Sequence, residues 1–338
     1  MEEFCDRREF LKTTFGLAAG LGLAPSVSSA STARCEMFKI SLAQWSLHRS
    51  HFAVDPSEFG WSKFVETLLS DDYRSLVTGS EIDPLHFAKV AREFEIDAIE
   101  YVNTFFFDRA RDEKYLEKMK KIADGEGVKG LVIMCDFEGN LGDPDAMQRA
   151  AAVEKHQKWV EAAKFLGCHS VRVNAHSDAS LPADQQQKLA AEGLRSLCEF
   201  ADQHDINVLV ENHGGLSSDA GWLVGVMERV DHPRVGTLPD FGNFKISEER
   251  EYNRYQGVRE LMPYAKAVSA KSYDFDEDGN ETSIDFARMM KLVLAADYRG
   301  YVGIEYEGAR LSEKEGIKAT RDLLLRAGRE IARQDGRG

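Results

Sequence analysis

Residues 206–215, with the sequence INVLVENHGG, decide how the chain is expected to fold. An apolar run of this length, rich in β-branched residues and followed by glycine, predicts a strand buried on both faces. Because side chains alternate along a strand, Glu211 and His213 point the same way at its carboxyl end. Parallel sheets carry their ligand sites at that end. The stretch therefore predicts a parallel sheet and the place of its site.

Two later apolar runs end in acids in the same manner. Residues 235–238 lead to Asp240, and residues 301–304 lead to Glu305. Taken singly, such acids are typical of helix N-caps and solvated loops. Three of them at the ends of strands that share one sheet instead favour a site for a hard or borderline metal ion.

Strand and helix patterns alternate along the rest of the chain. Eight units of this kind, without a glycine-rich dinucleotide fingerprint or a linker, favour a single-domain α/β fold, the closed (β/α)8 TIM barrel, over an open doubly wound sheet. The expected strands are 39–44, 98–102, 129–135, 170–174, 206–215, 235–238, 267–271 and 302–305, and the expected helices are 84–94, 115–127, 143–166, 185–204, 220–230, 254–262, 285–296 and 313–333.

The connection after the first strand, residues 48–83, is unusually long for a compact domain, which is typical of a lid or a binding element. Its part over 61–69 has a helical pattern. We expect Trp61 to cover part of the barrel mouth, the end where the strands terminate. We assign both Trp61 and Trp45, which directly follows the first strand, to substrate binding.

Composition narrows the classes of partner. The 338 residues carry a formal charge of −14 at pH 7, and 43% of them are hydrophobic, which is ample for a large core. An acidic surface repels phosphate backbones, which argues against nucleic acid as a partner. The five cysteines show no CxxC pair and no regular spacing, so no disulfide framework is expected.

Residues 1–33 resemble a twin-arginine signal peptide. Arg7 and Arg8 precede an apolar segment over 13–24 that is too short to span a bilayer, and small residues before Ser31 and Arg34 suit cleavage. We therefore expect a signal peptide over 1–33 and a barrel over 34–338. The mature protein is then periplasmic or otherwise extracytoplasmic, with no membrane segment.

Short motifs on successive strands resemble the xylose isomerase-like TIM-barrel superfamily, in particular its sugar phosphate isomerase/epimerase group. They are AQWSLHR (43–49), AIEY (98–101), SVRVN (170–174), VENHGG (210–215), LPDFGNF (238–244) and GIEYEG (303–308). The resemblance implies isomerisation, epimerisation or dehydration of sugars or inositols. It also implies a divalent metal held by Glu, Asp, His and Glu at the ends of strands five to eight. Carried over, Glu211, Asp240 and Glu305 become metal ligands.

The seventh strand departs from the family pattern, which is His-x-Lys. Lys271 aligns with the family lysine, whereas Ser269 stands where the histidine ligand is expected. A serine hydroxyl is a poor ligand, so His213, water or substrate must take the fourth position. Carboxylate and imidazole ligands together suit Mn²⁺, Co²⁺ or Zn²⁺ better than Ca²⁺, and Mg²⁺ remains an alternative.

The resemblance further implies proton transfer beside a sugar carbonyl through an enediolate. Glu211 and Glu305 would serve as acid and base, and Lys271 would be the third catalytic candidate. The residues expected to contact the sugar, besides the two tryptophans, are Glu100, Arg172, Asn174 and His176.

Two other functions stay open. A keto-sugar lyase or dehydratase would use the same enolate and expel a leaving group, and a catalytically silent sugar-binding barrel would explain the missing histidine. Export and the lack of a phosphate cradle favour an unphosphorylated sugar or glycoside. The particular sugar and the oligomeric state are not indicated by the sequence.

Export gives the first testable prediction. Replacing both Arg7 and Arg8 by Lys should leave uncleaved precursor in the cytoplasm, whereas Lys12→Arg, a matched basic exchange in the same segment, should not. Cell fractionation and the N-terminal sequence of the exported protein measure the result. Undiminished export of the double variant would contradict the twin-arginine interpretation.

Overall fold

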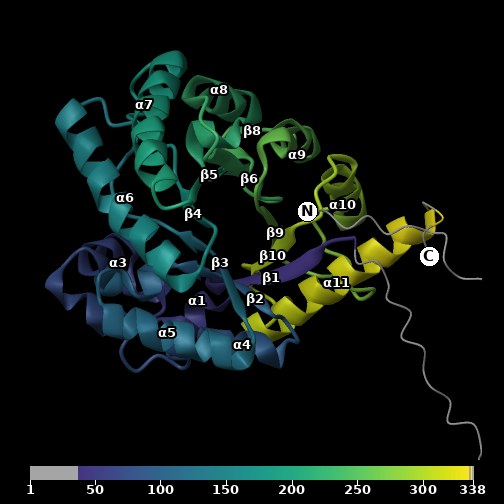
Figure 1. Cartoon of the computed structure of the whole chain (residues 1–338). Helices are drawn as coiled ribbons and strands as arrows, with labels where there is room; N and C mark the ends of the chain where they lie inside the picture. The colour runs from purple at the N-terminus through teal and green to yellow at the C-terminus, as the bar shows by residue number, and fades with distance from the viewer. Residues whose placement is uncertain (1–36, 335, 337–338) are drawn as a thin grey trace, which may run out of the picture. The chain divides into compact units, whose positions relative to one another are not determined.

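Eight parallel strands form the centre of the described structure, a computed structural model that describes residues 37–334 and 336. The expected signal peptide lies outside these residues and stays a prediction. The strands follow the order β6-β5-β4-β3-β2-β1-β10-β9 around the sheet (Figure 1). They are β1 (Lys39–Ala43), β2 (Ala98–Val102), β3 (Lys129–Met134), β4 (Ser170–Val173), β5 (Asn207–Glu211), β6 (Val235–Leu238), β9 (Val268–Ser272) and β10 (Tyr301–Tyr306). The predicted TIM barrel is confirmed.

The barrel closes between β6 and β9 through isolated bridges instead of a continuous ladder. One bridge joins Thr237 to Ala265, and the other joins Asp240 to Ser269. The Ser269 N–H donates to the Pro239 carbonyl at 2.9 Å, and the Ser269 carbonyl accepts from the N–H of Phe241 at 3.1 Å. This seam therefore places the side chain of Asp240 next to that of Ser269, at the barrel mouth.

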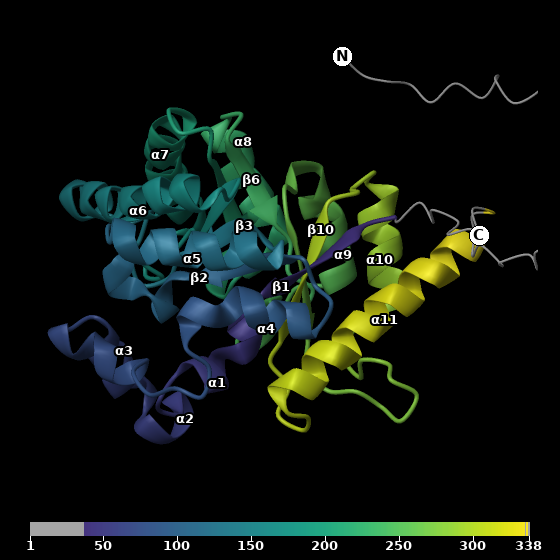
Figure 2. The same ribbon diagram turned by 60° about the horizontal axis from the view of Figure 1, so that its bottom comes forward.

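Helices follow the strands and cover the outside of the barrel (Figure 2). They are α4 (Phe87–Glu93), α5 (Glu113–Glu126), α6 (Ala146–Leu166), α7 (Ala183–Asp202), α8 (Ala220–Val230), α9 (Arg254–Leu261), α10 (Phe286–Ala295) and α11 (Glu313–Gln334). The long helix α6 starts later than predicted, because Asp145 is the residue whose side chain caps the first turn. It ends as predicted at Leu166, and Gly167, in the left-handed conformation, is its C-cap. Among the described residues, no helix has the length and apolar character needed to cross a membrane.

The long connection after β1 folds into short helices that gather on one side of the barrel (Figure 2). They are α1 (His48–His51), α2 (Pro56–Phe59) and α3 (Trp61–Leu68). The ring of Trp61 lies 5.6 Å from that of Phe64 and 6.2 Å from that of Phe137, which follows β3. Trp61 is nevertheless 55% exposed. Helix α3 therefore packs at the carboxyl end of β3.

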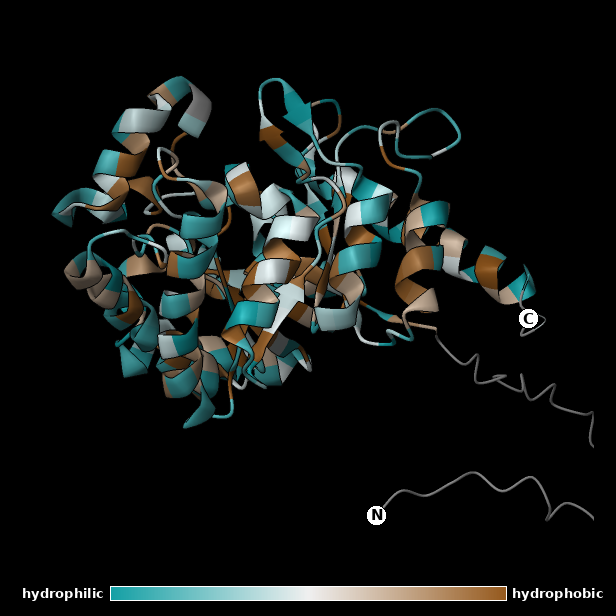
Figure 3. Ribbon diagram, turned by 90° about the horizontal axis from the view of Figure 1, so that it is seen from above, coloured by the Kyte–Doolittle hydropathy of each residue, from teal (hydrophilic) through white to brown (hydrophobic). Residues whose placement is uncertain are grey.

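One pair of strands was not predicted. Strands β7 (Lys245–Ser247) and β8 (Arg250–Glu251) form a short antiparallel hairpin after β6. The hairpin is rich in charged residues and lacks the alternation that marks a half-buried strand. Elsewhere the apolar residues concentrate on the strands and on the helix faces that meet them, as Figure 3 shows from above.

A pair of helical glycines tests the packing of the connection between β3 and α6. A Cβ at Gly193 of α7 would lie 1.9 Å from the carbonyl oxygen of Leu141, whereas a Cβ at Gly125 of α5 would meet nothing within 4 Å. Gly193→Ala should destabilise the protein by about 1–3 kcal/mol or more through overpacking. Gly125→Ala should stabilise it by up to about 1 kcal/mol. Thermal unfolding measures both, and equal effects would contradict the close approach.

Candidate metal centre

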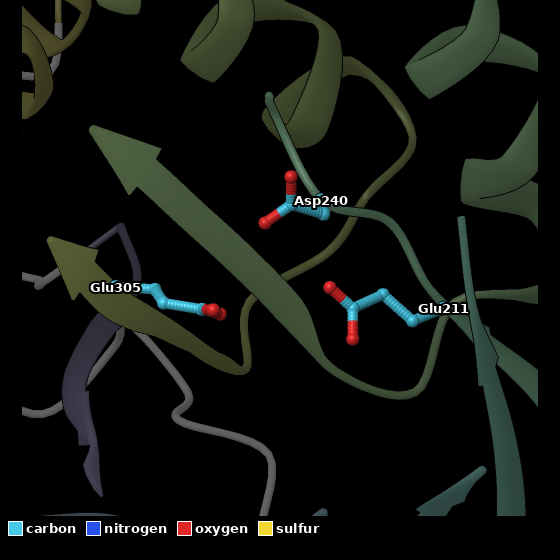
Figure 4. Close-up of side chains that lie close together, drawn as sticks. All are labelled: Glu211, Asp240 and Glu305. Carbon is cyan, nitrogen blue, oxygen red and sulfur yellow. The ribbon is translucent and has the colours of Figure 1, made fainter. Parts of the chain in front are cut away.

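Three buried carboxylates meet at the mouth of the barrel. Glu211 ends β5, Asp240 follows β6, and Glu305 belongs to β10. Each offers an oxygen within 4.8 Å of those of the other two, and the residues are 1%, 0% and 5% exposed, respectively. Figure 4 shows the three side chains pointing from their separate segments toward a common space. We call this group the acidic triad.

Asp240 is held by the turn that follows β6. Its Oδ1 accepts the backbone N–H groups of Gly242 and Asn243, both at 2.7 Å. Asn212 fixes its backbone on both sides, accepting from the Asp240 N–H at 2.8 Å and donating to the Asp240 carbonyl at 3.0 Å. The side chain of Asn243 also donates to Glu211 Oε1 at 3.0 Å. The two asparagines were not singled out in the sequence, although both belong to the quoted motifs.

Ser269 links two members of the triad. Its Oγ lies 2.7 Å from Asp240 Oδ2 and 3.0 Å from Glu305 Oε2. One hydroxyl proton serves two acceptors here, so the serine connects the carboxylates without neutralising them. The side chain that stands in place of the expected histidine therefore acts as a hydrogen-bond donor.

Lys271 is buried beside the triad, between two acids. Its Nζ lies 3.0 Å from Glu305 Oε1 and 2.8 Å from Glu307 Oε2. The indole N–H of Trp45 donates to the other oxygen of Glu307. Burial alone would lower the pKa of Lys271, but the two carboxylates outweigh it and raise the pKa well above its usual value. Lys271 is therefore a fixed ammonium. The sequence analysis did not assign Glu307, the residue directly after β10, to the site.

Arg172 lies on the other flank of the triad. Its Nε is 2.9 Å from Glu211 Oε2, and its Nη1 is 2.7 Å from Asp136 Oδ1. The buried guanidinium of Arg172, which the sequence analysis assigned to sugar contact, thus pairs with two acids, Glu211 and Asp136. Glu100 instead accepts from the hydroxyl of Ser41 at 2.6 Å and has no ion pair with Arg172 in the described part of the chain.

The two histidines assigned to the site, His213 and His176, are less buried than the residues of the triad. His213 follows β5 and is half-buried, and burial together with Arg172 lowers its pKa, so that the ring is neutral at neutral pH. Its nitrogens are not among the ligand atoms that lie within 4.8 Å of one another. His176 is exposed at the mouth. A ligand role for His213 and a substrate contact for His176 stay predictions.

The mouth holds an excess of negative charge. Three further carboxylates lie near the triad, and in the described part of the chain Arg172 and Lys271 are the fixed cations that pair with acids of this group. Carboxylates about 5 Å apart repel by roughly 3 kcal/mol per pair at an effective dielectric constant near 20. Burial is the main reason that the pKa of Glu211 and of Asp240 is raised to about 7. The further acids are Glu100, Asp136 and Glu307.

The donor set fits a divalent cation. It consists of oxygen atoms from separate segments, held by backbone and amide hydrogen bonds. Glu211 Oε2 is buried and has no hydrogen-bond partner with acceptable geometry, although it lies close to Arg172. That oxygen is therefore ion-paired with Arg172, and a cation would instead occupy the space between the three carboxylates, whose ligand atoms lie within 4.8 Å of one another.

Known proteins resemble this chain in part of its sequence or in its fold. The chain is 39% identical over 74 residues to the alpha subunit of the C-glycoside deglycosidase of Arthrobacter globiformis, a match that covers 20% of this chain and 21% of that one. It therefore spans about a fifth of that relative. The structure of 3-keto-D-glucoside 4-epimerase from E. coli superposes with a TM-score of 0.60 at 16% identity, over 72% of this chain and 94% of the epimerase.

A second solved structure is a xylose isomerase-like TIM barrel protein from Mycobacterium smegmatis in complex with magnesium. It superposes with a TM-score of 0.58 at 17% identity, over 86% of this chain and 96% of that one. At such identities the two structures show the fold alone. The family described as xylose isomerase-like TIM barrel matches residues 88–327, from α4 to α11, and this range includes the whole acidic triad. With well over half of its length matched, the chain belongs to the xylose isomerase-like TIM barrel family.

Proposed function

We propose that the protein is a metal-dependent isomerase or epimerase that acts on an unphosphorylated sugar or sugar derivative. The observation that carries this proposal is the acidic triad, a set of buried carboxylates whose ligand atoms lie within 4.8 Å of one another at the barrel mouth. The solved epimerase with the same fold supports the reaction class. Export by the twin-arginine route, which we propose from residues 1–33, agrees with a substrate outside the cytoplasm.

The triad would hold the cation. Glu211, Asp240 and Glu305 supply its protein ligands in this proposal, with His213, water or substrate completing the set. When bound, a divalent ion polarises the carbonyl and hydroxyl oxygens of a sugar and so makes the proton on the carbon beside them more acidic. The magnesium complex of the related barrel supports a divalent ion, and its identity here is left to measurement.

The chain's own residues supply the proton transfer. Glu211 and Glu305 enter the site from β5 and β10 and face the same space, so one can remove a proton while the other returns one. Asn243 and Arg172 orient Glu211, and Lys271 with Ser269 orients Glu305. Because Lys271 is a fixed ammonium, it stabilises negative charge that develops on a sugar oxygen close to Glu305.

The charge of the mouth supports an unphosphorylated substrate. The triad and the three carboxylates near it outnumber the two cations named above, and both cations are already paired. A phosphate group would add negative charge to this set without finding a free cationic partner among the named residues. Neutral hydroxyl groups, in contrast, donate to carboxylates readily.

Metal content tests the first half of the proposal. Protein purified without chelator should contain about one divalent ion per chain, and Glu211→Gln and Asp240→Asn should lose it because each removes a charged ligand. Glu100→Gln is the matched control, since Glu100 is a buried barrel carboxylate outside the triad. Elemental analysis and the rise of the melting temperature on adding metal are the measurements. Wild-type protein that takes up no ion would rule out the metal.

Isotope exchange tests the reaction. We expect the metal-loaded protein to incorporate deuterium from D₂O beside the carbonyl of at least one member of a panel of D-fructose, D-tagatose, D-psicose and methyl 3-keto-β-D-glucopyranoside. Glu305→Gln should slow the exchange by at least about 100-fold, as loss of a general base does. Mass spectrometry and NMR distinguish the alternatives. Release of water or of methanol identifies a lyase, and saturable binding without exchange identifies a sugar-binding protein.

A further inference from the structure

Asp136 is an acid of the barrel mouth that the proposed reaction does not use. It follows β3, and its side chain is 18% exposed. Its Oδ1 accepts from Arg172 Nη1 at 2.7 Å and from Asn174 Nδ2 at 2.8 Å. Its Oδ2 has no hydrogen-bond partner among the described residues. One oxygen therefore anchors the carboxylate, and the other is free to accept.

The neighbouring amide is oriented to accept as well. Asp136 can only accept when ionised, so the hydrogen bond between them requires that Asn174 donate through Nδ2. The Oδ1 of Asn174 then points elsewhere, and it is buried without a hydrogen-bond partner. Arg172 outweighs the effect of burial and lowers the pKa of Asp136 to about 2, which keeps the acceptor ionised. Two residues joined by one hydrogen bond thus each keep an acceptor oxygen that has no donor among the described residues.

The backbone around Asp136 is fixed in an unusual way. The buried Asn103 accepts from the N–H of Asp136 at 3.0 Å and donates to its carbonyl at 2.9 Å. The next residue, Phe137, has a φ of 63°, a left-handed conformation that is uncommon for a bulky residue. Such conformations cluster at ligand-binding sites, where the surrounding structure maintains them. Here the backbone turns Phe137 toward the exposed Trp61, 6.2 Å away.

From this arrangement, and resting on the proposed function, we propose that Asp136 and Asn174 form a hydroxyl-recognition subsite. It binds two neighbouring hydroxyl groups of the sugar on the β3–β4 flank of the barrel mouth, away from the carbons that react. The exposed ring of Trp61 and the half-buried ring of Phe137, the residue next to Asp136, offer an apolar surface to the carbon-bound face of the sugar.

The chemistry of the subsite selects a polyol over other ligands. Both open atoms are acceptors, so they require donors, and a phosphate or carboxylate would be repelled by Asp136. A second metal ion is disfavoured because, among the described residues, the groups of three ligand atoms within 4.8 Å of one another comprise the triad and do not include Asp136. Adjacent hydroxyls of a sugar supply the two donors that these acceptors lack. Sites built to bind a hydroxyl discriminate strongly against an analogue without it, because the buried acceptor is then left unpaired.

The test compares each parent sugar with its singly deoxygenated analogues. Full-chain protein loaded with metal is titrated by calorimetry with the four sugars of the exchange panel and with those analogues. Wild-type protein should bind at least one parent sugar and should bind one of its deoxy analogues about 10-fold to 100-fold more weakly. Asp136→Asn should bind the parent as weakly as that analogue and should bind the analogue itself unchanged. KM should rise by the same factor, with kcat and metal content kept.

Two further variants make the outcome decisive. Asn174→Leu removes the second acceptor without changing the charge and should abolish discrimination of a neighbouring hydroxyl, so the subsite is testable even if Asp136→Asn does not fold. Asp108→Asn is the control, because Asp108 is a partly exposed acid paired with Arg74 outside the site. Equal weakening of parent and analogue in both variants, or no weakening, overturns the subsite and leaves the proposed function intact. Wild-type protein that binds none of the sugars overturns both.

Discussion

Mutual repulsion within the acidic triad is the constraint on which the rest of the site depends. Closing the barrel brings Glu211, Asp240 and Glu305 from three segments into one buried space, where each additional negative charge is costly. The fold meets this cost with Arg172 on one flank and Lys271 on the other. Two cations do not balance the acids near the triad, and burial raises the pKa of Glu211 and of Asp240 to about 7, so that a bound proton or a bound cation lowers the repulsion.

The seam between β6 and β9 shows how the fold holds these charges in place. A regular ladder would have aligned the two strands residue by residue, whereas isolated bridges leave the chain after β6 free to turn. That turn supplies two backbone N–H groups to Asp240, and Asn212 locks its backbone. Ser269 then joins Asp240 to Glu305 across the seam. The irregular part of the barrel is therefore also the part that assembles the site.

The periodicity of apolar residues and the positions of acids at strand ends made most of the fold predictable from the sequence. The contacts between side chains that are distant in the sequence were not predictable. The apolar runs located every barrel strand, and the acids that end three of them marked the triad, because a strand's carboxyl end has a fixed place in a barrel. The hairpin of β7 and β8 and the start of α6 were not predicted correctly. Charged turns have little periodic pattern, and both Asp143 and Asp145 are suitable as the residue that caps α6. Asp136 and Glu307 were missed because their importance lies in contacts with Arg172 and Lys271, and a single sequence does not show which distant side chains meet.

The serine at position 269 changes the balance of the site without removing the reason for a cation. A neutral histidine would have offered a lone pair to a metal, whereas the serine hydroxyl gives its proton to carboxylates. Compared with the family pattern, the set of possible metal ligands therefore lacks one imidazole, while the number of carboxylates is the same. A site with fewer protein ligands and the same negative charge leaves more of the cation's coordination to water or to substrate oxygens. In the proposed function, the serine would therefore leave more of the cation's coordination to the sugar, and the residues proposed to orient the sugar, Asp136 among them, would carry a larger share of the selectivity.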